Sequence, residues 1–202
     1  MKIEEELVIK AMSGDEYAIN RLLNQSYSPA YRFALKYFGD HDTAMEVTQR
    51  CFIKVSEHIQ HLEDPKTYKS WLFRILTNQC HEEKRRAKSK GFLHWLSFTN
   101  KRVSTIEHAG LHNHLADSES EADQHMVAKE RQQILQDALE QIGSEGKTVL
   151  LLKHYEGLKF REIADILGIS ENTVKSRMYS ALHKLQTYFE SNPHLKMELW
   201  HD

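Results

Sequence analysis

The segment spanning residues 169–185, ISENTVKSRMYSALHKL, carries hydrogen-bond donors at the spacing of one helical face. Asn172, Lys175 and Ser176 share this face, and Tyr179 and His183 continue it. Such amide, ammonium and hydroxyl groups pair with base edges or phosphates in the major groove. An ordinary polar face of a structural hairpin is the alternative. We predict a duplex-reading helix with a contact set of Ser170, Asn172, Thr173, Lys175, Ser176, Arg177, Tyr179, Ser180 and His183.

The neighbouring residues predict how that face is held outward. Apolar spacing between Phe160 and Leu167 predicts a short helix, and Gly168 suits the left-handed position that ends it. Ser170 can then cap the next helix. Two helices joined by about three residues that include glycine form a helix-turn-helix. The side chains expected to pack inward from the second helix are Val174, Met178, Ala181, Leu182 and Leu185.

Charge is segregated along the chain, although the net charge is only −2. Residues 69–90 are mostly basic, residues 103–146 acidic and residues 147–188 basic again. Two basic segments around an acidic connector indicate a polyanionic partner contacted at two places. Solvated helix faces are the plainer interpretation of any single run. No stretch of about 18 apolar residues predicts a membrane span, and Cys51 and Cys80 are expected to be reduced in a cytoplasmic protein.

Helical periodicity runs through the first half of the chain. Ser13 and Glu16 have capping-box spacing, which predicts a helix that begins near Asp15. A second helical stretch covers Ala30–Tyr37, and a third apolar stripe covers Ala44–Ile59. Asp64-Pro65 predicts the start of a fourth helix, with the aspartate as N-cap.

The fourth helix is expected to bury Trp71 rather than stack it on a base, because this residue lies on the apolar stripe. Periodicity fades after Ala87, and helices resume at Met126, with Ser144 as a further cap. The predicted fold is all-α: two small helical domains joined by a flexible linker.

Two blocks resemble the extracytoplasmic-function type of bacterial sigma factor, a member of the sigma-70 family. They are GDHDTAMEVTQRCFIKV followed by KSWLFRILTNQCHEEKRRAK, and VLLLKHYEGLKFREIADILGISENTVKSRMYSALHKL. The resemblance implies a region 2-like domain over 1–90, a variable acidic linker over 91–125, a region 4-like domain over 126–190 and a tail over 191–202. It implies a transcription initiation factor that is not an enzyme and needs no cofactor or metal.

The resemblance also implies partners and residue roles. Region 2 would bind the clamp of the largest subunit of core RNA polymerase through Glu46, Gln49, Arg50 and Ile53. Region 4 would meet the flap of the second-largest subunit and read the −35 element, and an anti-sigma factor would hold the free protein. The melted −10 strand would contact His61, Lys66, Thr67, Tyr68, Lys69, Asn78, His81, Arg85 and Arg86.

This chain departs from the family's usual pattern at several positions. Arg50 stands where the family usually has an acid, and Glu82 and Glu83 add acid where the −10 helix is often more basic. These departures concern the individual contacts rather than the two domains.

Three other functions remain open on the sequence. A stand-alone helix-turn-helix regulator would bind duplex DNA without polymerase, and a helical interaction module would not bind DNA at all. A metal enzyme would use His108, His112 and His114, or Cys80 and His81. No second cysteine pair or carboxylate-flanked histidine motif completes such a metal site.

Overall fold

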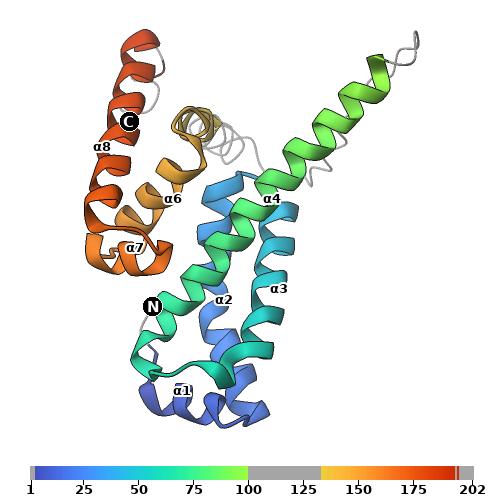
Figure 1. The fold of residues 1–202 in the computed structure, drawn as a ribbon, viewed down its shortest axis with the longest axis vertical. Coiled ribbons are helices and arrows are strands. Elements are labelled where there is room, and N and C mark those ends of the chain that lie inside the picture. The colour runs from blue at the N-terminus through green and yellow to red at the C-terminus, as the bar shows by residue number, and fades with distance from the viewer. Residues whose placement is uncertain (1–2, 100–132, 194, 196–202) are drawn as a thin grey trace, which may run out of the picture.

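The computed structural model describes residues 3–99, 133–193 and 195, which form helices and no strands (Figure 1). The predicted all-α fold is therefore confirmed over the described residues. Residues 133–141 are helical, and the other elements are α1 (Glu5–Met12), α2 (Glu16–Phe38), α3 (His41–His58), η1 (Ile59–His61), η2 (Pro65–Thr67), α4 (Tyr68–Thr99), α6 (Gly143–His154), α7 (Phe160–Leu167) and α8 (Glu171–Ser191).

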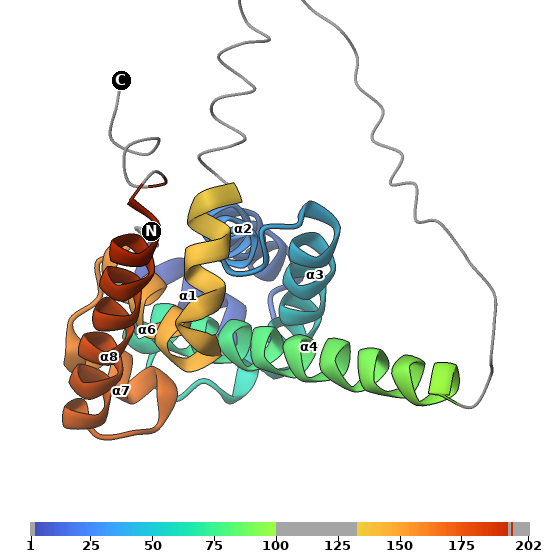
Figure 2. The same cartoon turned by 90° about the horizontal axis from the view of Figure 1, so that it is seen from above.

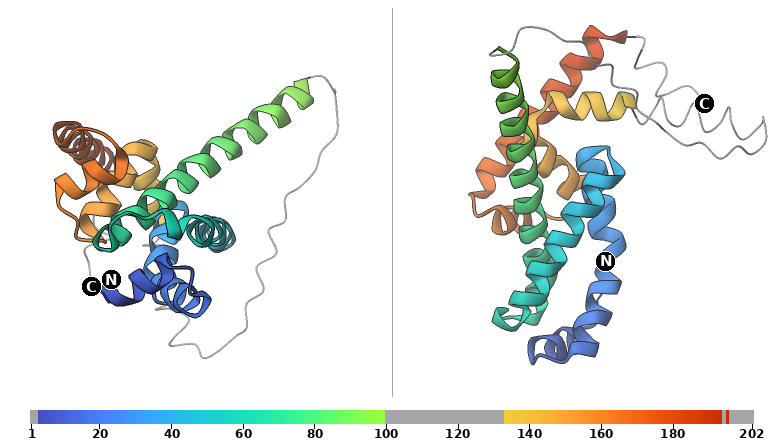
Figure 3. Two further views of the ribbon diagram at one scale, coloured as in Figure 1. Left: turned by 60° about the horizontal axis from the view of Figure 1, so that its bottom comes forward. Right: turned by 90° about the vertical axis from the view of Figure 1, so that its right-hand side faces the viewer.

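The first four helices form a bundle in which α2, α3 and the first half of α4 lie side by side (Figure 3). Its core contains the fully buried side chains of Phe33, Leu72, Phe73 and Leu76. Phe33 and Phe73 meet edge to face with ring centroids 5.6 Å apart, an arrangement that aromatic quadrupoles favour. This packing fixes how α4 lies against α2.

Helix α2 begins next to Asp15, as predicted, but its cap and its length differ from the prediction. Asp15, not Ser13, caps the helix, because the Asp15 carboxylate accepts a hydrogen bond from the Ala18 N–H at 3.0 Å. Ser13 instead ends α1, a helix that the periodicity did not predict. The two predicted helical stretches are one helix that continues through Pro29. Gly39 ends it in the left-handed conformation, with φ of 74°.

Helix α4 begins as predicted but ends much later. Asp64 caps the Pro65 turn by accepting a hydrogen bond from the Lys66 N–H at 2.9 Å, and α4 follows directly. The predicted loss of helix after Ala87 is wrong, since α4 runs to Thr99. Figure 2 shows its far end extending beyond α3.

The C-terminal helices contain the predicted corner. Gly168 ends α7 with φ of 65°, and the Ser170 hydroxyl accepts a hydrogen bond from the Thr173 N–H at 3.1 Å. Two smaller predictions are wrong: Ile142, not Ser144, is the N-cap of α6, and Leu182 is 41% exposed. The side chains of α8 that are buried are Val174, Met178 and Ala181.

The two halves of the described chain are packed against each other. Helix α4 contacts α7 and α6, and α2 also contacts α6, so the C-terminal helices lie along one side of the bundle (Figures 1 and 2). Most of α8 lies beyond α6 as seen from α4 (Figure 2), whereas its N-cap Ser170 lines one pocket with Trp71 and Arg74 of α4. This arrangement decides which of the predicted contact residues face solvent.

Candidate nucleic-acid and polymerase interfaces

The predicted duplex-reading face of α8 is exposed. Asn172, Ser176, Tyr179, Ser180 and His183 all face solvent, and Tyr179 is 66% exposed. This surface begins at a capped helix N-terminus, where backbone N–H groups favour phosphate. The donors that the sequence assigned to one face are therefore brought together on one face.

The two cationic side chains of the predicted contact set are each paired with an acid. Lys175 lies 2.6 Å from the Glu171 carboxylate one turn earlier, in a half-exposed pair that solvent screens. Arg177 turns toward α6 and lies 2.9 Å from the Glu145 carboxylate. Thr173 contributes to the cap, since its hydroxyl lies 2.8 Å from that of Ser170. Of the predicted set, Arg177 lies apart from the exposed face.

The residues predicted to hold the melted −10 strand fall into three groups. Tyr68 is buried at 2% exposure, and its hydroxyl lies 3.1 Å from the Ser26 hydroxyl, so its assignment as a strand contact is wrong for this structure. Lys69 and His81 face the C-terminal helices and are occupied there. The residues that remain exposed are His61, Lys66, Thr67, Asn78, Arg85 and Arg86.

The exposed face of α4 is less cationic than its sequence indicates. Arg86 lies 2.6 Å from the Glu82 carboxylate, so this guanidinium is partly neutralised, whereas Arg85 is exposed with no such partner described. Thr77, the residue before Asn78, is buried, and its hydroxyl donates to the Phe73 carbonyl oxygen at 2.8 Å.

The predicted polymerase-binding face lies on α3. Glu46, Gln49 and Ile53 are exposed, and Ile53 is 57% exposed among charged neighbours. A single exposed isoleucine is common on protein surfaces, so its assignment to polymerase docking rests on the resemblance to sigma factors. Near it, Tyr27 and Tyr31 of α2 stack with ring centroids 5.8 Å apart, and Phe52 meets Tyr27 edge to face. Residue spacing within one helix does not reveal this aromatic row, because the three rings come from two helices.

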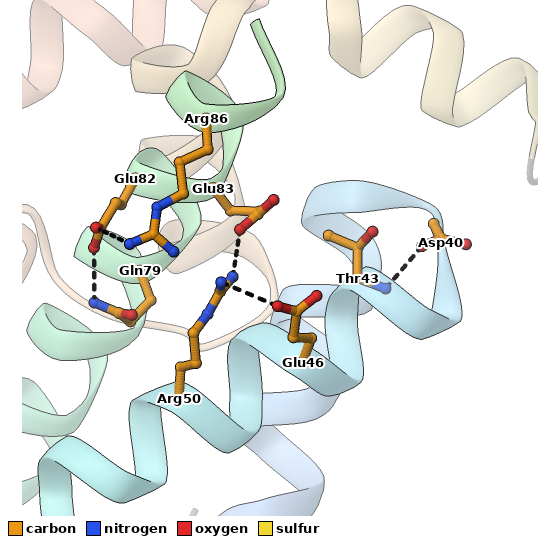
Figure 4. A network of polar contacts seen from close by, with 8 residues as sticks. All are labelled: Asp40, Thr43, Glu46, Arg50, Gln79, Glu82, Glu83 and Arg86. Atoms are coloured by element: carbon orange, nitrogen blue, oxygen red, sulfur yellow. Dashed lines mark hydrogen bonds and ion pairs between the residues drawn. The ribbon is translucent and has the colours of Figure 1, made fainter. Parts of the chain in front are cut away.

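Arg50 differs from its neighbours on α3, because it turns to α4. Figure 4 shows its guanidinium between Glu46, at 3.2 Å, and Glu83, at 2.5 Å. The side chains of Arg50 and Glu83 are only 25% and 16% exposed. The opposite charges of Arg50 and Glu83, both departures from the family pattern, thus neutralise each other. Arg50 joins α3 to α4. Its guanidinium is therefore occupied within the chain, which differs from its predicted role as a polymerase contact.

The two cysteines sit in the core of the bundle and are not paired with each other. Burial raises the pKa of the Cys51 thiol to about 12, and burial also raises the pKa of Cys80. Burial therefore keeps both as neutral thiols at neutral pH. The residues described contain no group of three metal-ligating side chains, and His108, His112 and His114 lie outside them.

Comparisons with known proteins match both halves of the chain. The model of Sigma-70 region 2 matches residues 22–90, and that of Sigma-70 region 4 matches residues 132–185. The RNA polymerase sigma factor SigV of Bacillus subtilis is 29% identical over 75% of this chain and 79% of its own. The sigma factor SigE of Mycolicibacterium smegmatis, named as an ECF factor, is 30% identical over 87% of this chain and 64% of its own. The chain belongs to the extracytoplasmic-function group of sigma-70 factors.

Solved structures agree with this assignment at the level of the fold. CnrH, a chain solved in complex with the cytosolic domain of CnrY, matches with a TM-score of 0.63 and 19% identity, over 93% of this chain and 97% of that one. The sigma factor RpoE of Bartonella quintana, solved with the anti-sigma factor NepR, matches with a TM-score of 0.59 over 85% of this chain.

The family assignment settles the function at the level of the whole chain. As a sigma factor, the protein directs core RNA polymerase to specific promoters and starts transcription there. Region 2 and region 4 occur together, in order, which a stand-alone helix-turn-helix regulator would not need. Sigma factors are non-catalytic initiation factors. Among the described helices, none is long and apolar enough to cross a membrane.

Proposed function

We propose that the two DNA-facing surfaces of this sigma factor read the two halves of one promoter. The exposed face of α8 enters the major groove of the −35 element, where Asn172 and Lys175 contact base edges and Ser176 contacts base or phosphate. The exposed residues around η2 and α4 hold the melted −10 strand. The carrying observation is that four of the five outward donors of α8 are exposed and Lys175 is half-exposed, all on a capped helix.

Single-strand capture needs polar pockets and cations, because unstacking a base costs a few kcal/mol per step. His61, Lys66 and Thr67 surround the start of α4, and Asn78 and Arg85 lie farther along its exposed side. These side chains can bond flipped bases and backbone phosphates. The proposed unit for this task is residues 1–90, joined by 91–125 to the −35 unit at 126–190, with 191–202 as a tail.

Polymerase docking is proposed for the exposed face of α3. Ile53 would enter an apolar contact on the clamp of the largest subunit, with Glu46 and Gln49 at its rim, and region 4 would meet the flap of the second-largest subunit. Ile53→Ala should weaken core binding about tenfold, because interface anchors of this size cost more than 1 kcal/mol on truncation. The neighbouring exposed Lys54→Ala is the matched control, and equal losses in both variants would contradict the assignment.

An anti-sigma factor is the third proposed partner. The RpoE chain of Bartonella quintana was solved with an anti-sigma factor, and the CnrH chain was solved with the cytosolic domain of CnrY. The CnrH chain matches 93% of this chain and the RpoE chain 85%, which supports a comparable partner here. Co-purification of the chain from its source cells, with identification of the bound protein, tests this point.

In vitro transcription tests the promoter contacts. Sigma-free core polymerase, this protein and a pool of promoter fragments from the source genome should give transcripts that share a two-part promoter. Lys175→Ala with Ser176→Ala should abolish them, whereas Lys184→Ala, about two and a half turns after Lys175 on α8, should not. Duplex binding by the protein alone with no initiation would favour the stand-alone regulator.

A further inference from the structure

Four side chains on one face of α4 bond to region 4, although Arg74 is also exposed to solvent. They are Lys69, Arg74, His81 and Lys84, here called the α4 row. At 1.5 Å per residue the row covers about 22 Å of the helix. The resemblance to sigma factors assigned Lys69 and His81 to the −10 strand, and Lys84 directly precedes Arg85 and Arg86 of the same set. The row therefore overlaps the proposed single-strand surface.

The first two members bind carbonyl oxygens at the ends of region 4 helices. Lys69 Nζ donates to the Glu156 carbonyl oxygen at 3.2 Å, just after α6, and lies 3.9 Å from the carboxylate of the same residue. Arg74 Nε donates to the Ile166 carbonyl oxygen at 3.2 Å, and Nη2 donates to that of Asp165. Such carbonyls are unpaired within their helix and carry its partial negative charge.

The other two members bind side chains of region 4. His81 Nε2 lies 2.8 Å from the Thr148 hydroxyl, which itself donates to the Ser144 carbonyl oxygen at 2.9 Å. The histidine is therefore the donor in the first bond. Lys84 pairs with Glu140, whose other carboxylate oxygen lies 2.6 Å from the buried ammonium of Lys147. All four members of the row thus have acceptors within the same chain.

The same packing leaves the recognition face of region 4 open. Asn172, Ser176 and Tyr179 are exposed while the α4 row is occupied, because most of α8 lies beyond α6 as seen from α4 (Figure 2). The closed arrangement therefore blocks one DNA-binding surface and not the other.

We propose that region 4 is an intramolecular competitor of single-stranded promoter DNA for the α4 row. Helix-end carbonyls and carboxylates of region 4 occupy the cations and the histidine that phosphates and bases of the −10 strand would otherwise bind. The closed chain can engage a −35 duplex, but it holds the −10 strand only after region 4 has moved off α4. This inference rests on the proposed assignment of α4 to the −10 strand.

The competition makes apparent single-strand affinity depend on the open fraction of the chain. A protein whose binding-competent state is rare binds more weakly by that fraction. Contacts that draw region 4 elsewhere, to the −35 duplex or to polymerase, would raise the open fraction. The free sigma factor would thus avoid single-stranded nucleic acid until polymerase and promoter are both present.

The test weakens the region 4 side of the interface and leaves every α4 side chain intact. In Thr148→Val with Glu156→Gln, His81 loses its acceptor and Lys69 loses its carboxylate, while the shapes of the side chains are kept. Thr187→Val with Glu190→Gln makes the same chemical changes on the exposed end of α8, away from α4. Affinity for a short fluorescein-labelled single-stranded DNA of mixed sequence is measured by anisotropy for all three chains.

The Thr148/Glu156 variant should bind the probe about fivefold more tightly than the wild type, because two polar contacts that favour closure are lost. Its radius of gyration from small-angle scattering should rise, and the control should match the wild type in both measurements. Unchanged affinity in a variant that melts like the wild type would overturn the proposal, as would an equal gain in the control. Tighter binding without expansion would overturn it too.

Two further measurements separate failure of the competition from failure of folding or of the proposed promoter contacts. If the double variant does not fold, Thr148→Val alone is measured against Thr187→Val, with about a twofold gain expected for the loss of one contact. Initiation by the wild-type chain with core polymerase reports on the proposed promoter contacts, whereas the ratio of single-strand affinities reports on competition by region 4. A failure of either is therefore visible without the other.

Discussion

The α4 row and the recognition face of α8 carry similar chemistry but lie in opposite surroundings. Both place basic and hydrogen-bonding side chains on one side of a long helix, yet region 4 covers the row while the face of α8 is exposed. Segregated positive charge in a sequence indicates a polyanionic partner. The comparison teaches that helix ends and carboxylates of the same chain can act as that partner, so the charge pattern alone does not tell which surface is open.

The largest expected effect is on duplex binding by the exposed surface. Lys175→Ala with Ser176→Ala should cost about 3 kcal/mol, roughly 100-fold in affinity, because each base-edge contact is worth about 1–3 kcal/mol. Binding to a duplex that carries the −35 element is measured by anisotropy, with Lys184→Ala as control. The loss should be equal in the wild-type and Thr148/Glu156 backgrounds. An additional dependence on that background would mean that the α8 face is also covered in the closed chain.

The next effect concerns the buried end of the row. Glu140→Ala leaves the ammonium of Lys147, whose side chain is 1% exposed, without its carboxylate partner. Burial of an unpaired charge is costly, so the free energy of unfolding in urea should fall by about 2 kcal/mol. The cost stays below that of a fully buried pair because the Glu140 side chain is 47% exposed. Lys147→Met should be close to neutral, and a larger loss there than in Glu140→Ala would contradict this account.

A smaller effect is expected at the Arg50–Glu83 pair, which joins the polymerase-facing helix to α4. Arg50→Glu places two acids together and should lower the free energy of unfolding by about 1.5 kcal/mol, and Arg50→Glu with Glu83→Arg should recover most of it. A urea double-mutant cycle measures the coupling. Additive losses would show that the two side chains are independent, whatever their distance in the structure.

The smallest effect is a pH dependence of closure through His81. Burial lowers the pKa of His81 below its ordinary value of 6.5; Glu145 opposes the lowering and Arg177 adds to it. The ring also faces Tyr37 and Thr148. The closed state therefore binds fewer protons than the open state, and closure should weaken as pH falls below about 6.5.

Small-angle scattering at a series of pH values measures that weakening as a rise in the radius of gyration. The series should stop at about pH 5.5, because burial raises the pKa of Glu156. Protonation of Glu156 in the closed state favours closure as pH falls, which opposes the effect of His81. His81→Gln keeps a neutral donor for Thr148 and should remove the dependence. A dependence that persists in this variant would assign it to another group.

Most of the fold was predictable from signals between residues close in the sequence. The errors arose where contacts between distant segments decide the structure. Gly168 and Ser170 define the helix-turn-helix corner within a few residues, and Asp64 with Pro65 does the same for α4, so these were predictable. Tyr68 was misplaced because the partner of its hydroxyl, Ser26, lies 42 residues away. No periodicity reveals that a helix continues through Pro29 when packing supports it.

The interface between the two regions was beyond sequence reasoning for the same reason. Lys147 reads as an exposed lysine, and only the approach of Glu140 and the Tyr37 ring, 5.4 Å from its ammonium, accounts for its burial. The pairing of Arg50 with Glu83 spans 33 residues, so each appeared only as a departure from the family pattern. The exposed face of α8, by contrast, lies within one helix, and its spacing was enough.

The acceptors that hold Lys69 and Arg74 have a consequence for how this protein can evolve. Three of them are main-chain oxygens, of Glu156, Asp165 and Ile166, and every amino acid supplies one. Mutations in region 4 can therefore alter promoter preference on α8 without deleting these bonds. Inheritance of these three bonds depends instead on two codons in α4, those for Lys69 and Arg74, so a lineage could diversify its target genes while keeping this part of the interface.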